Sequence, residues 1–375
     1  MPETTPRGFL NSEFETRTAN AQHLMAQHGF AGLLLMSEPD VRYFSGFHTL
    51  FWQSPTRPWF LFVPASGKPV AVIPEIGAEL MRRTWLDDIR TWSAPAPKDD
   101  GISLLIELLS PFAAQGAKIG VMKGHETGLR MPLGDWEKLM AALPSLMIGD
   151  ATALVQGLRM VKSPAEIEKL AHICAIGSAT FARIPEIVTE GMPLDQVFRN
   201  FRREALDQGA DDAPYVVGGA AQGGYADVIS PPSQRPLQKG DVLMIYSGST
   251  WDGYFCDFDR NWAIGHSTDD AKRAYDVLWR ATEAGIAAAR PGASPVVSAA
   301  QASPACRSSA ATTSGLRSDD SVICCRENVS HSAASSSSRS SASPSWCSDP
   351  ACSVTPPTSS IGASSARVGE TAAAS

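Results

Sequence analysis

Cysteine is scarce through most of this 375-residue chain, in which only Cys174 and Cys256 precede residue 300. Both are expected to be reduced interior residues, while the five cysteines after residue 300 fit no zinc spacing, and a disulfide set among them would contradict a cytoplasmic protein. The chain has no cluster of basic residues and a net charge of −7, which disfavours a nucleic-acid partner. Its longest apolar run, residues 30–36, is too short to span a membrane. The start lacks the basic-then-apolar form of a secretory signal, so we expect a cytoplasmic protein.

Residues 1–155 alternate helix and strand signals and form the first candidate domain. The length of 375 residues and the 43% apolar content allow two or three domains with their own cores. The expected elements are a helix from about Glu13 to His28, buried strands at 31–36 and 117–122, a hairpin of 59–64 with 69–74, and a helix near 133–143. This order predicts a small α/β domain.

Residues 156–296 form a second region with clear helix signals. Ser163 is a good N-cap, Pro164 suits the first helical position, and Glu166 completes a capping box. The apolar stripe expected on this helix consists of Ile167, Leu170, Cys174, Phe181 and Ile184. The next helix is marked by Leu194, Val197, Phe198, Phe201 and Leu206. A glycine-rich stretch follows at 216–232, and a last helix is expected from about Thr268 to Arg290.

Between these helices, residues 245–265 predict a β-hairpin whose tip is Trp251-Asp252-Gly253. Strand alternation places Asp257 and Asp259 on one face of its second strand. Carboxylates on one face of a strand are typical of a metal site.

The composition changes abruptly near residue 297. Residues 301–375 contain 23 serines and no lysine, and they show no hydrophobic period. One interpretation is a natural disordered tail, which cannot bury enough apolar surface to offset its ordering entropy. The other is a shifted reading frame, which the abruptness favours. Residues 297–375 are therefore set apart as a low-complexity, disordered or out-of-frame tail.

Several segments, in this order, resemble the creatinase/Xaa-Pro aminopeptidase family of pita-bread hydrolases. They are EPDVRYFSGF at 38–47, LRMVKSPAEIEKL at 158–170, and the hairpin segment at 235–265. The resemblance covers roughly residues 13–296. It implies an α/β (α+β) fold, with a creatinase-like N-terminal domain followed here by an incomplete pita-bread domain and a disordered tail.

The resemblance also implies chemistry. In the family, two hairpin aspartates, a histidine and two glutamates hold two divalent ions, manganese, cobalt or zinc, which activate water against a C–N bond. Directly opposed residues on a hairpin have Cβ atoms ~5 Å apart, which allows two carboxylates to bind the same two metal ions. Small peptide or amide substrates and homodimers are implied for intact relatives.

This chain departs from that pattern. Asp257 matches the second hairpin aspartate, but the first, expected opposite it, is replaced by Tyr246. A neutral phenol with a pKa of about 10 is a poor substitute for a bridging carboxylate. The tail offers only His331, Glu327 and Glu370, without family-like flanks. We therefore expect one of five ligands and an inactive chain with no tightly bound metal.

Other candidates are weaker. Asp259 and Arg260 are expected either to orient the ligands or to form a salt bridge at the strand end. Tyr225 is expected either to line the pocket or to pack as an ordinary aromatic. Three functions stay open: an Xaa-Pro aminopeptidase-like hydrolase by lineage, a creatinase-like or ectoine-hydrolase-like enzyme acting on small amides or amidines, and a non-catalytic binding homologue.

Overall fold

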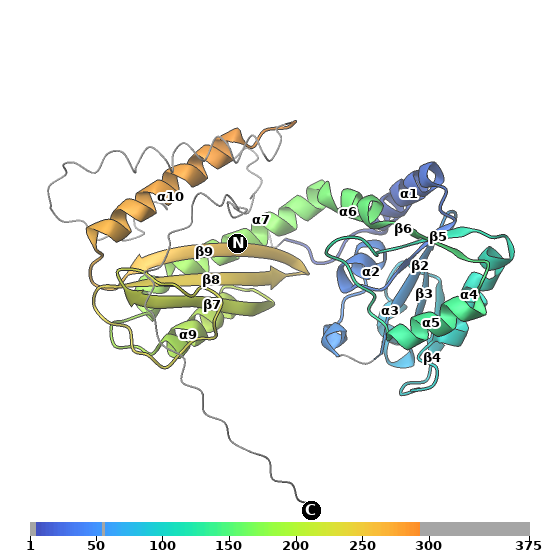
Figure 1. The fold of residues 1–375 in the computed structure, drawn as a ribbon, viewed down its shortest axis with the longest axis horizontal. Helices are drawn as coiled ribbons and strands as arrows, with labels where there is room; N and C mark the ends of the chain where they lie inside the picture. Colours follow the sequence, from blue (N-terminus) through green and yellow to red (C-terminus); the bar gives the residue numbers. More distant parts are fainter. Residues whose placement is uncertain (1–4, 55–56, 293–375) are drawn as a thin grey trace, which may run out of the picture. The chain divides into compact units, whose positions relative to one another are not determined.

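The computed structural model describes residues 5–54 and 57–292 (Figure 1). Among these, the residues up to His266 form one compact unit, and those from Ser267 onward belong to a second. The predicted tail, 297–375, lies outside the described residues. No helix among the described residues is long and apolar enough to cross a membrane.

The first unit begins with a mixed six-stranded sheet in the order β4-β3-β2-β1-β5-β6 (Figure 1). Strand β1 pairs antiparallel with β2 and parallel with β5. The strands are β1 (Gly32–Leu35), β2 (Phe60–Pro64), β3 (Val70–Pro74), β4 (Asp88–Trp92), β5 (Lys118–Val121) and β6 (Met147–Asp150). The helices around it are α1 (Asn11–His28), α2 (Glu38–Ser45), η1 (Leu50–Gln53), η2 (Glu75–Gly77), α3 (Ala78–Met81), α4 (Ile102–Ala114), α5 (Leu133–Ala142) and α6 (Thr152–Met160).

Both faces of this sheet are covered, because successive strand residues point to opposite sides. Leu33 and Leu35 belong to one core cluster, with side chains from α1, α2 and α6. Leu34 belongs to the other, with side chains from α4 and α5. The α/β domain predicted from the sequence is thus confirmed, including the hairpin of β2 and β3. Strands β4 and β6 were not predicted, since their residues are only partly buried and carry a weak apolar pattern.

The second part of this unit is a three-stranded antiparallel sheet in the order β7-β8-β9, packed on helices. Its elements are α7 (Pro164–Ala182), α8 (Ile184–Ile187), α9 (Leu194–Asp207), β7 (Asp212–Gln222), β8 (Asp241–Trp251) and β9 (Tyr254–Ala263). One face of the sheet joins α7 and α9 in a core that includes Ile173, Phe198, Ile245 and Cys256. Cys256 is 3% exposed, and burial raises its pKa to about 11, so the predicted interior position of this cysteine is confirmed, whereas Cys174 is only partly buried.

The first turns of α7 bury other residues than those predicted. The capping box of Ser163 and Glu166 is present, as expected. Ile167, however, is 55% exposed, while Glu166 and Lys169 are 4% and 2% exposed. The predicted apolar stripe was therefore wrong at the start of α7. Glu166 and Lys169 are buried there because they form ion pairs with residues distant in sequence. On α9, Leu206 is likewise exposed, and Ala205 takes the expected place in the core.

Strand β7 includes the first part of the glycine-rich stretch, which we had not assigned to a strand. Gly218 has φ +143°, and a Cβ atom there would lie 2.2 Å from the carbonyl oxygen of Met244. Glycine is therefore required where β7 approaches β8.

The described part of the second unit contains α10 (Asp269–Ala288). Thr268 caps it by accepting a hydrogen bond from the Ala271 amide. The helix predicted from about Thr268 to Arg290 is thus confirmed. None of its residues is buried.

Candidate functional site

The predicted hairpin is formed by β8 and β9, which are joined by a two-residue turn. Trp251 pairs with Tyr254, and the residues between them, Asp252 and Gly253, have φ of +47° and +70°. Positive φ at both central positions matches the right-handed twist of the flanking strands.

The register differs from the one expected by family resemblance. Asp257 lies opposite Gly248, and Tyr246 lies opposite Asp259. A pairing of Tyr246 with Asp257 would centre the turn on Trp251 and Asp252, but it is centred one residue further along the chain. The prediction that Tyr246 and Asp257 are directly opposed was therefore wrong. Because side chains alternate, Tyr246, Asp257 and Asp259 still share one face, with Tyr246 and Asp257 diagonal to each other.

Asp257 is held by two phenols. The Tyr215 hydroxyl donates to its Oδ1 at 2.8 Å, and the Tyr246 hydroxyl donates to its Oδ2 at 3.3 Å. The two rings meet edge to face, with centroids 5.2 Å apart. Burial raises the pKa of Tyr215, and its neighbours Tyr246 and Asp257 raise it further, so this phenol stays a neutral donor. Tyr215 was missed in the sequence, because it arrives from β7, 42 residues before Asp257.

Asp259 and Arg260 form no direct ion pair, although the positive charge of Arg260 partly offsets the rise in the pKa of Asp259. They alternate across the strand, and the Arg260 guanidinium lies over the ring of Phe258 at 5.0 Å. Arg260 donates to the backbone carbonyl of Asp259 at 2.7 Å, and within residues 5–54 and 57–292 the two form no ion pair with each other. The expected salt bridge is therefore absent from the described chain. Loss of hydration raises the pKa of Asp259, and the negative charge of Asp257 adds to this.

Tyr225 reaches the same face from the loop after β7. Its hydroxyl donates to Oδ1 of Asn261 at 2.7 Å, two residues beyond Asp259. Burial raises the pKa of Tyr225 to about 12, with a smaller contribution from Asp259. The face thus brings two carboxylates together with three neutral phenols.

These residues do not fit a two-ion metal centre. Among the described residues, no group of three or more His, Cys, Asp and Glu side chains is arranged to hold a metal ion. Both oxygens of Asp257 accept phenol hydroxyls, where a bridging carboxylate would present them to cations. His331, Glu327 and Glu370, the sequence's remaining candidates, lie outside the described residues.

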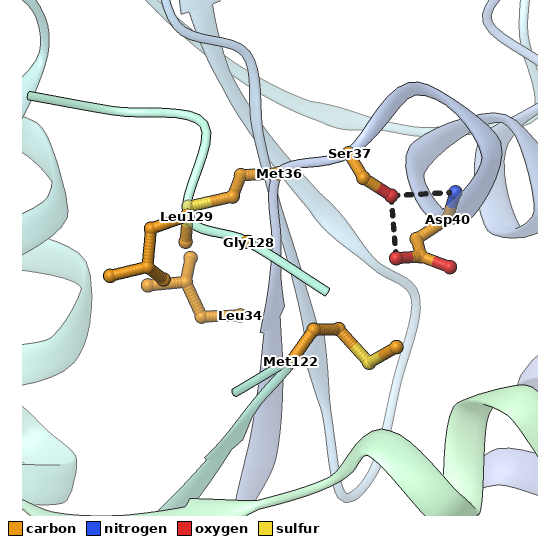
Figure 2. A pocket seen from close by; sticks show the side chains of 7 residues that line it. All are labelled: Leu34, Met36, Ser37, Asp40, Met122, Gly128 and Leu129. Carbon is orange, nitrogen blue, oxygen red and sulfur yellow. Dashed lines mark hydrogen bonds between the residues drawn. The ribbon is translucent and has the colours of Figure 1, made fainter. Parts of the chain in front are cut away.

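Two cavities lie away from this face. The smaller, shown in Figure 2, is lined by Leu34, Met36, Ser37, Asp40, Met122, Gly128 and Leu129. Its volume of about 10 Å³ has room for about one water molecule. The larger, about 420 Å³, lies beside the tip of the hairpin and is bordered by Arg42, Asp252 and Tyr254. Asp257 lines neither of them.

The described chain up to His266 is thus an α/β domain followed by a helix-backed antiparallel sheet. Residues 17–161 match the creatinase/prolidase N-terminal domain, and residues 168–333 match metallopeptidase family M24. The chain therefore joins a creatinase/prolidase N-terminal domain to an M24 metallopeptidase domain. The M24 match extends past residue 296, where we had expected family-like sequence to end.

Named relatives agree with this assignment. The probable dipeptidase PepE of Mycobacterium tuberculosis is 29% identical over 298 residues, covering 76% of this chain and 73% of that protein. The creatinase of Bacillus sp. is 22% identical over 293 residues, covering 76% and 68%. The crystal structure of dipeptidase PepE from Mycobacterium ulcerans matches with a TM-score of 0.65 at 28% identity, covering 81% of this chain and 78% of that one. A prolidase from Thermococcus sibiricus, at 20% identity and a TM-score of 0.62 with 73% and 71% covered, shows the shared fold.

Proposed function

We propose that this chain derives from the dipeptide-hydrolysing branch of family M24 and that, as its sequence stands, it does not hydrolyse peptides. The observation that carries this proposal is the surroundings of Asp257, whose two oxygens accept hydroxyls from Tyr215 and Tyr246. The dipeptidase and prolidase relatives support small peptides as the ancestral substrates.

The chemical reason is charge. A pair of divalent cations needs several anionic oxygens, and Tyr246 supplies a neutral hydroxyl at the position of an expected carboxylate. A cation that binds Asp257 would share each oxygen with a phenol hydroxyl, which already satisfies part of the negative charge of the carboxylate. A divalent ion held by one carboxylate keeps mostly water ligands and binds weakly, so the residues described here provide no activated water.

The direct test combines elemental analysis with a substrate panel of Xaa-Pro and other dipeptides. We expect the full chain to retain no stoichiometric manganese, cobalt or zinc and to show no turnover. Tyr246→Asp alone should not restore activity, because further ligands are still needed. Tyr246→Phe is the matched control, since it removes the hydroxyl without adding a charge. Turnover by the unmodified chain that is abolished by a chelator would overturn the proposal.

A second candidate is metal-independent hydrolysis of a small amide or amidine. It is favoured by a polar face built from phenols and carboxylates, and by the likeness to creatinase. Creatine and ectoine belong in the same panel, assayed with a chelator present. Chelator-resistant turnover that is lost in Asp257→Asn would select this candidate, whereas its absence leaves a non-catalytic binding homologue. Homodimer formation, implied for intact relatives, is part of the proposal and is measured by light scattering.

A further inference from the structure

Helix α7 buries a charged side chain that the candidate site does not use. Lys169 is 2% exposed, although an ammonium group loses strongly favourable hydration on burial. Its Nζ donates to Oδ2 of Asp252 at 2.6 Å and to the carbonyl oxygen of Pro6 at 2.7 Å. A buried lysine thus joins the hairpin turn to the start of the chain.

Asp252, at the hairpin turn, is itself 6% exposed and has partners from three segments. Besides Lys169 of α7, its Oδ1 accepts from Nη2 of Arg42 at 3.1 Å, and its Oδ2 accepts from the amide of Gly8 at 2.8 Å. Arg42 belongs to α2 of the N-terminal domain. A single turn residue is therefore bound to both domains and to the N-terminal segment.

The N-terminal segment 6–9, here called the strap, holds the turn from its other side. Arg7 donates from Nη1 and Nη2 to the two oxygens of Asp211, at 2.8 and 2.6 Å. Asp211 in turn accepts the backbone amide of Asp252 at 2.7 Å. The Arg7 guanidinium also lies 4.8 Å from the ring centroid of Trp251, the residue before the turn. The strap thus fixes both the backbone and the side chain of Asp252.

Phe9, the last residue of the strap, contacts the other side of the turn. Its ring meets that of Tyr254, the first residue after the turn, edge to face at 6.0 Å. The cations of Arg17 and Lys169 lie 4.4 and 4.7 Å from its centroid. An aromatic ring between two cations is stabilised by their attraction to its faces. Both flanks of the turn are therefore in contact with the strap.

We infer that the strap, together with Arg42 and Lys169, locks the turn of the acidic hairpin to the N-terminal domain through Asp252. Asp252 is a positioning residue, because it holds the turn of the hairpin, and Asp257 lies five positions further along the chain on β9. The lock is a conformational device that is independent of whether the chain hydrolyses peptides. Its release frees the N-terminal segment and the hairpin turn together.

The Arg7–Gly8 peptide bond provides a sharp test, since trypsin cleaves after arginine. In the locked chain the groups on both sides of this bond are held, by Lys169 and by Asp252. Asp252→Asn leaves buried Lys169 and partly buried Arg42 without this anion, so we expect cleavage there to become roughly a hundredfold faster. Asp207→Asn, at the exposed end of α9, is the matched control and should cleave like the unmodified chain. Arg42→Gln is a milder variant and should also accelerate cleavage.

Amide hydrogen exchange distinguishes a local lock from general destabilisation. We expect Asp252→Asn and Arg7→Ala to speed exchange in residues 246–257 and to leave β1 unchanged. Equal trypsin cleavage of the Asp252→Asn and unmodified chains would overturn the inference. So would an exchange increase of the same size in β1 and in the hairpin.

Discussion

At the residue scale, Asp257 and Asp259 share one face of the hairpin but differ in their hydrogen-bond partners. The oxygens of Asp257 accept hydrogen bonds from neutral phenols, which solvate the carboxylate within the fold. Within the described part of the chain no side chain donates to the neighbouring Asp259, and although part of this residue is exposed, loss of hydration raises its pKa.

Replacement of Asp259 by asparagine should stabilise the protein at neutral pH. A folded-state pKa above the unfolded value of about 3.9 means that folding favours the protonated form. The charged form thus costs stability, and this cost develops as the pH rises from below the unfolded pKa through the folded one. We expect Asp259→Asn to raise Tm at pH 7 and to change it little at pH 3. Asp207→Asn is the control, and a gain of equal size at both pH values would contradict the argument.

Gly253 should be irreplaceable in the hairpin turn for two separable reasons. Its φ of +70° is strained for any side chain, and a Cβ atom there would overlap Nη1 of Arg42. Gly67 has a φ of +88° but open space around its Cβ position. Gly67→Ala should therefore cost only the backbone strain, about 1 kcal/mol, while Gly253→Ala should cost distinctly more. Urea unfolding of both variants measures the difference, and equal losses would show that Arg42 moves away freely.

At this scale, the sequence predicts which face of a strand a residue occupies, but it does not predict which side chains from other strands contact that residue. Alternation placed Asp257 and Asp259 together on β9. The predicted strand pairing placed the turn one residue too early in the chain. The sequence alone does not show that Asp252 adopts a positive φ. Tyr215 could not be linked to Asp257, since strand β7 was hidden in a glycine-rich stretch.

At the scale of elements, α7 combines a local start signal with distant ionic contacts. The Ser163 hydroxyl accepts the Glu166 amide at 3.2 Å, and Oε2 of Glu166 accepts the Ser163 amide at 2.9 Å. Oε1 of Glu166 meets Arg17 of the N-terminal domain at 3.2 Å and accepts the hydroxyl of Tyr254, the first residue of β9, at 2.8 Å. The local signal was predictable, but the burial of Glu166 was not, because Arg17 is remote in sequence.

Two substitutions should separate these roles of the capping box. Ser163→Ala removes one cap and should lower the unfolding free energy by about 1 kcal/mol. Glu166→Gln keeps the shape but leaves buried Arg17 with Glu13 as its one remaining ionic partner among the described residues, and should cost about 3 kcal/mol. Exposed Glu168→Gln is the control. Denaturant unfolding gives all three values, and a smaller loss for Glu166→Gln than for Ser163→Ala would contradict this division.

At the scale of the whole molecule, the tail raises a question that DNA can answer. Residues 301–375 change composition abruptly, while the M24 match runs to residue 333. We expect another forward frame, translated from codon 290 onward, to encode a histidine within a glycine-rich run and then two glutamates on strand-like segments. Stop codons throughout both alternative frames would establish the tail as genuine.

The N-terminal domain should fold on its own, and the point where it is cut should decide its stability. Both faces of its sheet are covered, one of them by Leu154 and Val155 of α6, against which Leu158 also packs. Arg159, near the end of α6, donates to Oδ1 of Asp40 at 2.9 Å.

Asp40 is 2% exposed, and its other side-chain partner is Ser37 (Figure 2). A fragment of residues 1–155, the predicted domain, loses Arg159 and leaves this buried carboxylate without a cation. A fragment of residues 1–161 keeps the pair and the whole of α6.

We therefore expect residues 1–161 to melt cooperatively and residues 1–155 to be about 3 kcal/mol less stable. Calorimetry and urea unfolding of the two fragments measure this difference. Arg159→Gln in the longer fragment is the matched control, because it removes the cation while keeping the helix. If it loses as much stability as the truncation does, the ion pair sets the boundary. If it loses little, the boundary is set by the packing of α6, and equal stability of the two fragments would show that the domain ends before Gln156.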